Sequence, residues 1–327
     1  MNHEIKKIGV FTSGGDAPGM NAAVRAVVRT AKFYDIAVEA IYQGYKGMVA
    51  GNIKPLSTRS VANIIQRGGT VLKTARSDEF RQAEGRKMAY ANLKKHNIDA
   101  CIVVGGDGSY TGAKVFTEEY PDIPFIGLPG TIDNDIYGTD LTIGFDTAVN
   151  TAMEAIDKIR DTGSSHDRLF FIEVMGRHAG FIALYTGLGA GASTIFLPET
   201  VTPIDHLIDK LQRSSQRKKL FNMVVVAEGN ENGNAMEIAQ KVKEHYGYEA
   251  RVTILGHLQR GGSPTAVDRV LATRLGYSAV KCLVEGDKNI ALGIINDELI
   301  KTPFVDAITK KKDLNKDLLD MANILSL

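Results

Sequence analysis

Short apolar runs recur along this chain, and they restrict the folds open to it. Each run is rich in isoleucine, valine or phenylalanine and ends at a glycine or a turn; the runs cover residues 8–11, 101–104, 125–128, 169–174, 223–227 and 252–255. Because apolar residues in them do not alternate with polar ones, both faces of each strand are expected to be covered, as in parallel sheets. Apolar residues at helical spacing occur in 20–34 and 151–160. This alternation of strands and helices predicts an α/β fold.

Length and composition exclude several classes of protein. The 327 residues suffice for two domains. A total of 39 Lys plus Arg against 38 Asp plus Glu leaves a net charge of +1, which argues against a nucleic-acid-coating protein. The two cysteines, Cys101 and Cys282, cannot form a disulfide framework, and 18 consecutive apolar residues occur nowhere. The apolar stretch near the N-terminus is too short for a signal sequence, so we expect a soluble, cytoplasmic protein without a membrane partner.

Two stretches, residues 8–19 and 101–112, run from an apolar strand into Gly-Gly-Asp and then into a helical pattern. Such strand-end loops line the ligand crevice of α/β sheets, and the following helix favours anions. The absence of Gly-Lys excludes a Walker A loop, and Gly106, Gly108 and Gly112 miss the dinucleotide spacing by one residue. The glycines permit close approach of phosphate, and the carboxylate of Asp107 suits Mg²⁺. A tight turn with a capping aspartate is the alternative interpretation.

A second candidate site is the acidic segment that follows residues 125–128. In an extended chain, Asp133 and Asp135 would point to one side and Asn134 to the other. Two carboxylates beside a metal-phosphate site suit general base catalysis, in which one of them accepts the proton of an attacking hydroxyl. An Asp-rich turn that caps the next helix is the alternative.

Basic residues form two further groups. The first combines His257 with arginines in polar loops or at strand ends: Arg76, Arg168, Arg177, Arg251 and Arg260. Because guanidinium binds phosphate in a bidentate manner, several arginines in glycine-rich loops indicate a dianionic substrate. The second group comprises Arg25 and Arg29, one helical turn apart, with Arg59, Arg160, Arg217 and Lys219. A second anion site and a solvated surface are both open interpretations of that group.

Taken together, these motifs resemble those of bacterial ATP-dependent 6-phosphofructokinases over essentially the whole chain. The stretches that carry the resemblance are TSGGDAPGMNA from Thr12, GGDGSY from Gly105, GLPGTIDNDI from Gly127, SSHDR from Ser164, EVMGR from Glu173 and LGHLQRGGSP from Leu255. The resemblance implies the phosphofructokinase fold, with two Rossmann-like three-layer α/β/α domains and the active site in the cleft between them. Residues 1–143 plus 258–308 would bind ATP, and residues 144–257 plus 309–327 would bind fructose 6-phosphate.

The resemblance also implies roles for individual residues in the glycolytic transfer of phosphate from ATP to the 1-hydroxyl of fructose 6-phosphate. ATP would contact Gly15, Arg76, Ser77, Gly106, Asp107, Gly108 and Ser109, with Asp107 on Mg²⁺. Asp133 would be the base, supported by Thr131, Asp135, Arg76 and Arg177. The sugar phosphate would contact Thr131, Asp133, Met175, Gly176, Arg177, Glu228, His257 and Arg260, with Arg168 and Arg251 supplied by a neighbouring subunit. Such shared active sites imply a homotetramer.

A few single positions indicate which phosphoryl donor the enzyme would use and how an effector would regulate it. Pyrophosphate-dependent relatives typically have Asp at the position of Gly108 and Lys at that of Gly130, so these two glycines favour ATP. The family's effector site would use the second basic group, Arg25, Arg29, Arg59, Arg160, Arg217 and Lys219, to bind ADP or phosphoenolpyruvate. Where allosteric members have a Glu that helps bind Mg²⁺, this chain has Ser193, and Phe221 stands where His is frequent. We therefore expect activation by Mg-ADP to be weakened or lost.

Two other functions remain as alternatives to the ATP-dependent kinase. One is a pyrophosphate-dependent phosphofructokinase, and the other is a catalytically silent sensor of phosphorylated metabolites. Intact Asp107, Asp133 and Arg177 argue against the sensor, because a sensor need not retain a base.

Overall fold

The chain divides into two compact units in the computed structural model, which describes residues 5–163, 169–216 and 222–325. The first unit comprises Met1–Thr131, Ile136–Asp146 and Arg260–Lys312. The second comprises Ile132–Asp135, Thr147–Gln259 and Asp313–Leu327. The assignment of one domain to ATP and the other to the sugar phosphate stays a prediction, and so do the domain boundaries expected from the sequence.

A seven-stranded sheet forms the centre of the first unit, in the order β11-β10-β5-β4-β1-β2-β3. Its strands are β1 (Lys7–Thr12), β2 (Ala37–Ile41), β3 (Ile53–Pro55), β4 (Ala100–Gly105), β5 (Phe125–Pro129), β10 (Ile290–Ile295) and β11 (Glu298–Pro303). The five inner strands are parallel, and the edge strands β3 and β11 run antiparallel to their neighbours. All six residues of β4 are buried, as expected for a strand covered on both faces.

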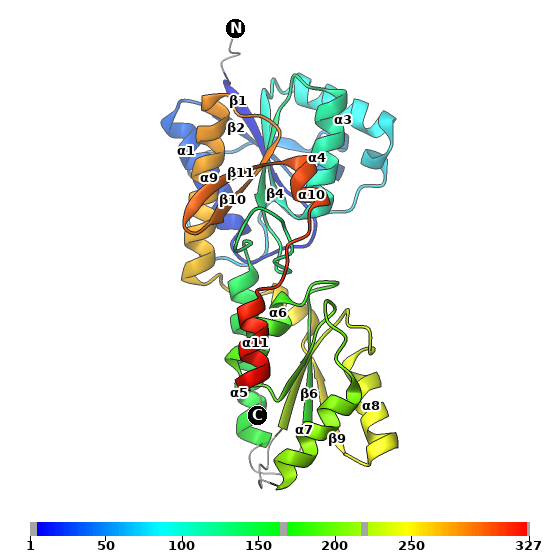
Figure 1. Cartoon of the computed structure of the whole chain (residues 1–327). Coiled ribbons are helices and arrows are strands. Elements are labelled where there is room, and N and C mark those ends of the chain that lie inside the picture. Colours follow the sequence, from blue (N-terminus) through cyan, green and yellow to red (C-terminus); the bar gives the residue numbers. More distant parts are fainter. Residues whose placement is uncertain (1–4, 164–168, 217–221, 326–327) are drawn as a thin grey trace. The chain divides into compact units, whose positions relative to one another are not determined.

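Helices cover both faces of this sheet (Figure 1). The helices of the unit are α1 (Met20–Phe33), α2 (Gly44–Ala50), α3 (Ala83–Lys95), α4 (Asp107–Glu119), α9 (Ala266–Glu285) and α10 (Phe304–Thr309), with a short 3₁₀ turn η1 (Glu79–Arg81). On one face α1 and α9 lie side by side, and on the other α4 packs against α10. The two helices of the first face approach closely at Gly276, where a Cβ atom would lie 2.6 Å from the carbonyl oxygen of Ala23.

The second unit contains a four-stranded parallel sheet in the order β7-β8-β6-β9. Its strands are β6 (Leu169–Val174), β7 (Thr194–Phe196), β8 (Asn222–Ala227) and β9 (Ala250–Ile254), and β9 leads into the 3₁₀ segment η2 (Gly256–Arg260). Its helices are α5 (Phe145–Gly163), α6 (Phe181–Gly189), α7 (Ile204–Gln216), α8 (Ala235–Tyr246) and α11 (Lys316–Leu325). Phe171, Phe196 and Val224 of the sheet share a buried cluster with Leu207 of α7 and Ile238 of α8.

The α/β fold and all six strands expected from the sequence are confirmed, with three differences in detail. The expectation that the last run is buried is wrong, because β9 is an edge strand and Ile254 remains 54% exposed. Five strands, β2, β3, β7, β10 and β11, lie outside the predicted runs. The helix predicted over 151–160 begins six residues earlier. Across residues 5–163, 169–216 and 222–325, each helix falls short of the length and apolarity that crossing a bilayer requires.

Candidate active site

Three neighbouring strands of the first unit end at the same edge of its sheet. In the parallel register Thr12 of β1 lies beside Val104 of β4, and Gly105 lies beside Pro129 of β5. The three loops that follow, residues 13–16, 106–109 and 130–131, therefore leave the sheet as neighbours. This arrangement brings the two Gly-Gly-Asp loops together at the edge where α/β proteins bind ligands.

Gly105 allows the two glycine loops to touch through their backbones. The N–H of Ser13 donates to the carbonyl oxygen of Val104 at 2.9 Å. A Cβ atom on Gly105 would lie 2.6 Å from the carbonyl oxygen of Ser13 and 2.3 Å from Oγ of Ser109. Such distances are too short for any real Cβ atom, so only glycine fits without displacing a loop.

The second glycine loop opens directly into α4. Gly106 precedes the helix, and Asp107 and Gly108 are exposed at its first two positions. The N-terminus of a helix attracts anions through its free N–H groups and its dipole. A Cβ atom on Gly108 would meet no atom within 4 Å, so the space in front of this turn is open. The turn thus combines the N-terminal end of a helix, open space and one carboxylate.

Tyr45, which no sequence motif predicts as part of the site, supports this turn. Its hydroxyl donates to the carbonyl oxygen of Ser109 at 2.5 Å. Burial raises the pKa of the Tyr45 phenol well above its usual value, so it remains a donor. Gly112 allows the ring to approach, since a Cβ atom there would lie 2.9 Å from it. A tyrosine 64 residues away in the chain carries no local signal of this contact.

Arg260 lies against the first glycine loop. Its Nη1 donates to the carbonyl oxygen of Asp16 at 3.3 Å. A Cβ atom on Gly15 would lie 2.5 Å from the same nitrogen. Elsewhere in this unit Arg76 is exposed, and the hydroxyl of Ser77 accepts from the N–H of Phe80 of η1 at 3.2 Å.

The acidic segment after β5 turns rather than continuing as a strand. Asn134 has φ 56°, in the left-handed region, so the extended arrangement with Asp133 and Asp135 on one side is wrong. Asp133 is 3% exposed and Asp135 is half-buried. The carboxylate Oδ2 of Asp133 lies 3.7 Å from Nε of Arg177. A buried carboxylate beside a guanidinium is thereby held in a fixed place.

The backbone around Arg177 adopts an unusual conformation. Gly176 has φ 141° and Arg177 has φ 53°, which side chains rarely adopt. The N–H of Arg177 donates to Oε1 of Glu228 at 2.7 Å. A Cβ atom on Gly229 would lie 1.8 Å from the carbonyl oxygen of Arg177, so the two backbones are in direct contact. The family resemblance implies that Glu228 contacts the sugar; in the structure its carboxylate holds the backbone of this loop.

The other residues predicted to contact the substrate lie on several elements, and one of them falls outside the described residues. Met175 follows β6 and is buried, while His257 on η2 and Arg251 on β9 are exposed. Thr131 accepts a hydrogen bond at its carbonyl oxygen from Oγ1 of Thr142 at 2.6 Å. Arg168 lies outside the described residues.

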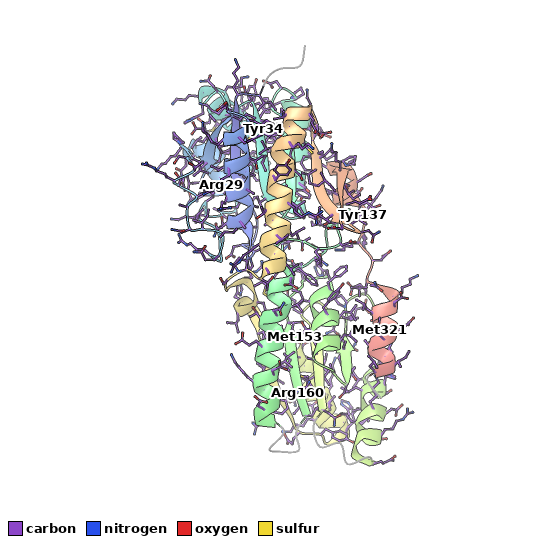
Figure 2. The ribbon with its side chains drawn as sticks, turned by 90° about the vertical axis from the view of Figure 1, so that its left-hand side faces the viewer. Arg29, Tyr34, Tyr137, Met153, Arg160 and Met321 are labelled. Carbon is purple, nitrogen blue, oxygen red and sulfur yellow. The ribbon has the colours of Figure 1, made fainter. Side chains whose placement is uncertain are left out.

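Residues of the proposed effector site occur in both units (Figure 2). Arg25 and Arg29 lie on α1, and the pKa of Arg25 is lowered, mainly by burial and further by the charge of Arg29. Arg59 is exposed, and Arg160 on α5 donates to the carbonyl oxygen of Ala190. Arg217, Lys219 and Phe221 lie outside the described residues.

Ser193, which stands where a metal-binding Glu was expected in allosteric relatives, is 3% exposed. Its hydroxyl donates to Oδ1 of Asn222 at 3.3 Å, and its carbonyl oxygen accepts from Nζ of Lys210 at 3.2 Å. The position is therefore part of the packed end of β7 and β8 and presents no negative charge.

The parallel sheets and their glycine-rich loops define the class of α/β proteins that bind phosphorylated ligands at strand ends. A family model described as Phosphofructokinase matches residues 7–283. The chain belongs to the phosphofructokinase family.

Individual relatives agree with this assignment. The chain is 53% identical over 324 residues to "ATP-dependent 6-phosphofructokinase 2" of Bacteroides thetaiotaomicron, covering 99% of both chains. It is 55% identical over 323 residues to "ATP-dependent 6-phosphofructokinase 1" of Thermus thermophilus, covering 99% of this chain and 100% of the relative. A solved structure of phosphofructokinase from Saccharomyces cerevisiae matches with a TM-score of 0.89 at 39% identity; the match covers 98% of this chain and 48% of the yeast chain.

Proposed function

We propose that this phosphofructokinase is a glycolytic kinase that transfers the terminal phosphoryl group of ATP to the 1-hydroxyl of fructose 6-phosphate. The observation that carries the proposal is the backbone contact between the two glycine loops at the ends of β1 and β4, which excludes a side chain at Gly105 and holds the loops as neighbours beside the open space at Gly108. Full-length relatives at 53% and 55% identity, named ATP-dependent 6-phosphofructokinases, support the same activity.

Mg-ATP is the proposed donor. The turn at the start of α4 suits its phosphates, because a helix N-terminus and open space lie together there. No cluster of three or more His, Cys, Asp or Glu side chains suited to a metal occurs among the described residues. A single carboxylate fits Mg²⁺, which keeps most of its waters and shares the oxygens of the substrate's phosphates. Asp107 would hold the metal, and the bound ion would neutralise charge on those oxygens.

Two glycines argue for ATP against pyrophosphate. A Cβ atom on Gly130 would lie 2.8 Å from Cγ1 of Val104 and 3.2 Å from the N of Gly105. A lysine at that position, as in pyrophosphate-dependent relatives, would have to displace the strand ends. Gly108, in contrast, has open space, and its lack of a side chain leaves that space to the nucleotide phosphates.

Asp133 is the proposed base. The buried carboxylate could accept the proton of a hydroxyl that approaches it, and Arg177 at 3.7 Å keeps it oriented. Thr131, Asp135 and Arg76 would support the reacting groups. The sugar phosphate would be bound by Met175, Gly176, Arg177, Glu228, His257 and Arg260, and by Arg168 and Arg251 from a neighbouring subunit of a cytoplasmic homotetramer.

An anionic effector, ADP or phosphoenolpyruvate, is proposed to bind the basic group that includes Arg25 and Arg29. The pKa of Arg25 is lowered first by burial and then by the charge of Arg29, and a bound anion would relieve the repulsion between the two side chains. The buried hydroxyl of Ser193 cannot replace a carboxylate on the effector's metal, so Mg-ADP would be a poor activator.

The decisive experiment is a coupled assay with fructose 6-phosphate and either ATP or pyrophosphate, on the wild type and on Asp133→Asn. Loss of the base is expected to lower kcat by about 10²- to 10⁴-fold. Asp140→Asn is the matched control: Asp140 is exposed in the same loop region and should keep wild-type kcat. Nucleotide binding without turnover by the wild type would refute the kinase in favour of a sensor, and turnover with pyrophosphate alone would refute the donor.

A further inference from the structure

Gln259 is a fully buried carboxamide in the middle of an exposed segment. It lies in η2 between His257, which is exposed, and Arg260, which contacts the first glycine loop. Leu258, its direct neighbour, is 62% exposed, whereas Gln259 is 0% exposed. The apolar side chain of Leu258 is thus exposed and the polar side chain of Gln259 is buried, although apolar residues are usually the buried ones.

The side-chain oxygen of Gln259 holds the backbone at the end of β6. The pairing of β6 with β9 ends where the N–H of Leu255 donates to the carbonyl oxygen of Glu173 at 3.0 Å. The N–H of Met175, two residues after Glu173 and just past the end of β6, donates at 2.8 Å to Oε1 of Gln259. The glutamine thus continues the ladder with its side chain after the backbone of η2 has turned away.

Met175 begins the strained loop that carries Arg177, and Gln259 and Glu228 fix this loop at its two ends. Gln259 accepts from the N–H of Met175, and Glu228 accepts from the N–H of Arg177. Between these two hydrogen bonds lies the left-handed turn with φ 141° at Gly176 and 53° at Arg177. Such backbone conformations persist only where the surrounding structure holds them. The direction of the Arg177 side chain, and its 3.7 Å approach to Asp133, depend on this turn.

The amide nitrogen of Gln259 has no acceptor among the described residues. A buried polar group without a partner destabilises a fold, so a leucine or methionine would fill this volume more favourably. The hydrogen bond from the N–H of Met175 is therefore the one contact that glutamine makes here and that an apolar side chain of similar size could not make.

We propose that Gln259 is a positioning residue, which acts through the backbone of Met175 to set the turn at Gly176 and hence the place of the Arg177 guanidinium. The proposal rests on the phosphofructokinase activity proposed above, because Arg177 is the group through which it reaches the substrates. Gln259 touches neither substrate, and its effect is on fructose 6-phosphate and on the transfer step rather than on ATP binding.

The test compares Gln259→Met, which keeps the length but has no acceptor oxygen, with Gln259→Glu, which keeps an acceptor at the same reach. Gln259→Asn serves as a second loss variant, since it is one methylene too short to reach Met175. Misplacement of a reacting group by about 1 Å can cost about 100-fold in rate. We therefore expect Gln259→Met and Gln259→Asn to lower kcat/KM for fructose 6-phosphate by about 10- to 100-fold, with KM for ATP unchanged within about twofold. Gln259→Glu should retain most of the wild-type kcat/KM.

A double-mutant cycle with Arg177→Ala separates positioning from mere packing. If Gln259 acts through Arg177, then Gln259→Met, or Gln259→Asn if the methionine variant does not fold, should change kcat/KM by less than about twofold in the Arg177→Ala background. Multiplicative losses, an equal rise in KM for ATP, or a Gln259→Asn enzyme with wild-type kinetics would each overturn the proposal. Wild-type turnover is measured alongside; its absence would refute the proposed function itself, whereas the inference about Gln259 is judged only on ratios to an active wild type.

Discussion

Adding a single methyl group at Gly105 should separate the two glycine loops. In Gly105→Ala the new Cβ atom would lie 2.3 Å from Oγ of Ser109 and 2.6 Å from the carbonyl oxygen of Ser13. The hydroxyl can rotate away, but the carbonyl oxygen belongs to the backbone, and a normal contact requires it to move by about 0.5–1 Å. Overpacking of this kind costs about 1–3 kcal/mol. At about 2–4 °C per kcal/mol, the melting temperature should fall by roughly 2–12 °C.

The same displacement should weaken ATP binding, because the moved loop is one wall of the proposed phosphate site. We expect KM for ATP to rise by about tenfold or more and KM for fructose 6-phosphate to stay within about twofold. For the stability effect the matched control is Gly108→Ala, which adds the same methyl group to the same loop, in open space and on a helix, and should be at least as stable as the wild type. Thermal unfolding and initial rates at varied ATP test both variants. A Gly105→Ala enzyme with wild-type melting temperature and KM for ATP would refute the steric reasoning.

Two further predictions concern stability and regulation. Glu119 and Arg86 join α4 to α3 through two hydrogen bonds of 2.6 and 2.7 Å, and these lower the pKa of Glu119. A lowered folded-state pKa contributes stability above the unfolded pKa, and that stability is lost as pH falls through the folded pKa. Glu119→Gln should therefore melt about 2–4 °C lower than the wild type at pH 7, for a loss of about 1 kcal/mol. The difference in melting temperature should shrink as pH falls below the ordinary glutamate pKa of about 4.3, and an equal difference at pH 7 and in acid would contradict this. ADP titrated at constant ATP should leave a sigmoidal fructose 6-phosphate curve nearly unchanged, and strong activation would contradict the interpretation of Ser193.

The strands that could be predicted are those whose burial leaves an apolar run. Residues 101–104 are such a case, since β4 is covered on both faces. β3 and β7 contain three residues each, too few for any pattern, and β11 is an edge strand with mostly exposed residues. The apolar run of β10 was available in the sequence but was not among the predicted strands. Most of the strands that were not predicted were missed because they are short or lie at the edge of a sheet, rather than because their residues have a weak strand propensity.

Residues with local motifs could be proposed for the site, whereas those that act through distant contacts could not. Asp107 and Gly108 follow an apolar strand within five residues and are visible as a motif. Tyr45 reaches Ser109 across 64 residues, and Gln259 reaches Met175 across 84. No spacing rule links such pairs, because the fold alone makes them neighbours. The turn at Asn134 was also hidden, since an acidic segment gives no indication of its φ angle.

The discontinuous make-up of the first unit has a consequence for synthesis on the ribosome. Its sheet needs β10 and β11, and α1 needs α9, so the unit lacks these partners until residues up to 312 have been made. The strands of the second sheet, β6 to β9, lie within residues 169–254 and emerge earlier. Chains fold as their segments become available, and contacts between distant segments form late. The nascent N-terminal strands therefore wait longest for their final neighbours, which makes this stretch the one most in need of protection from aggregation during translation.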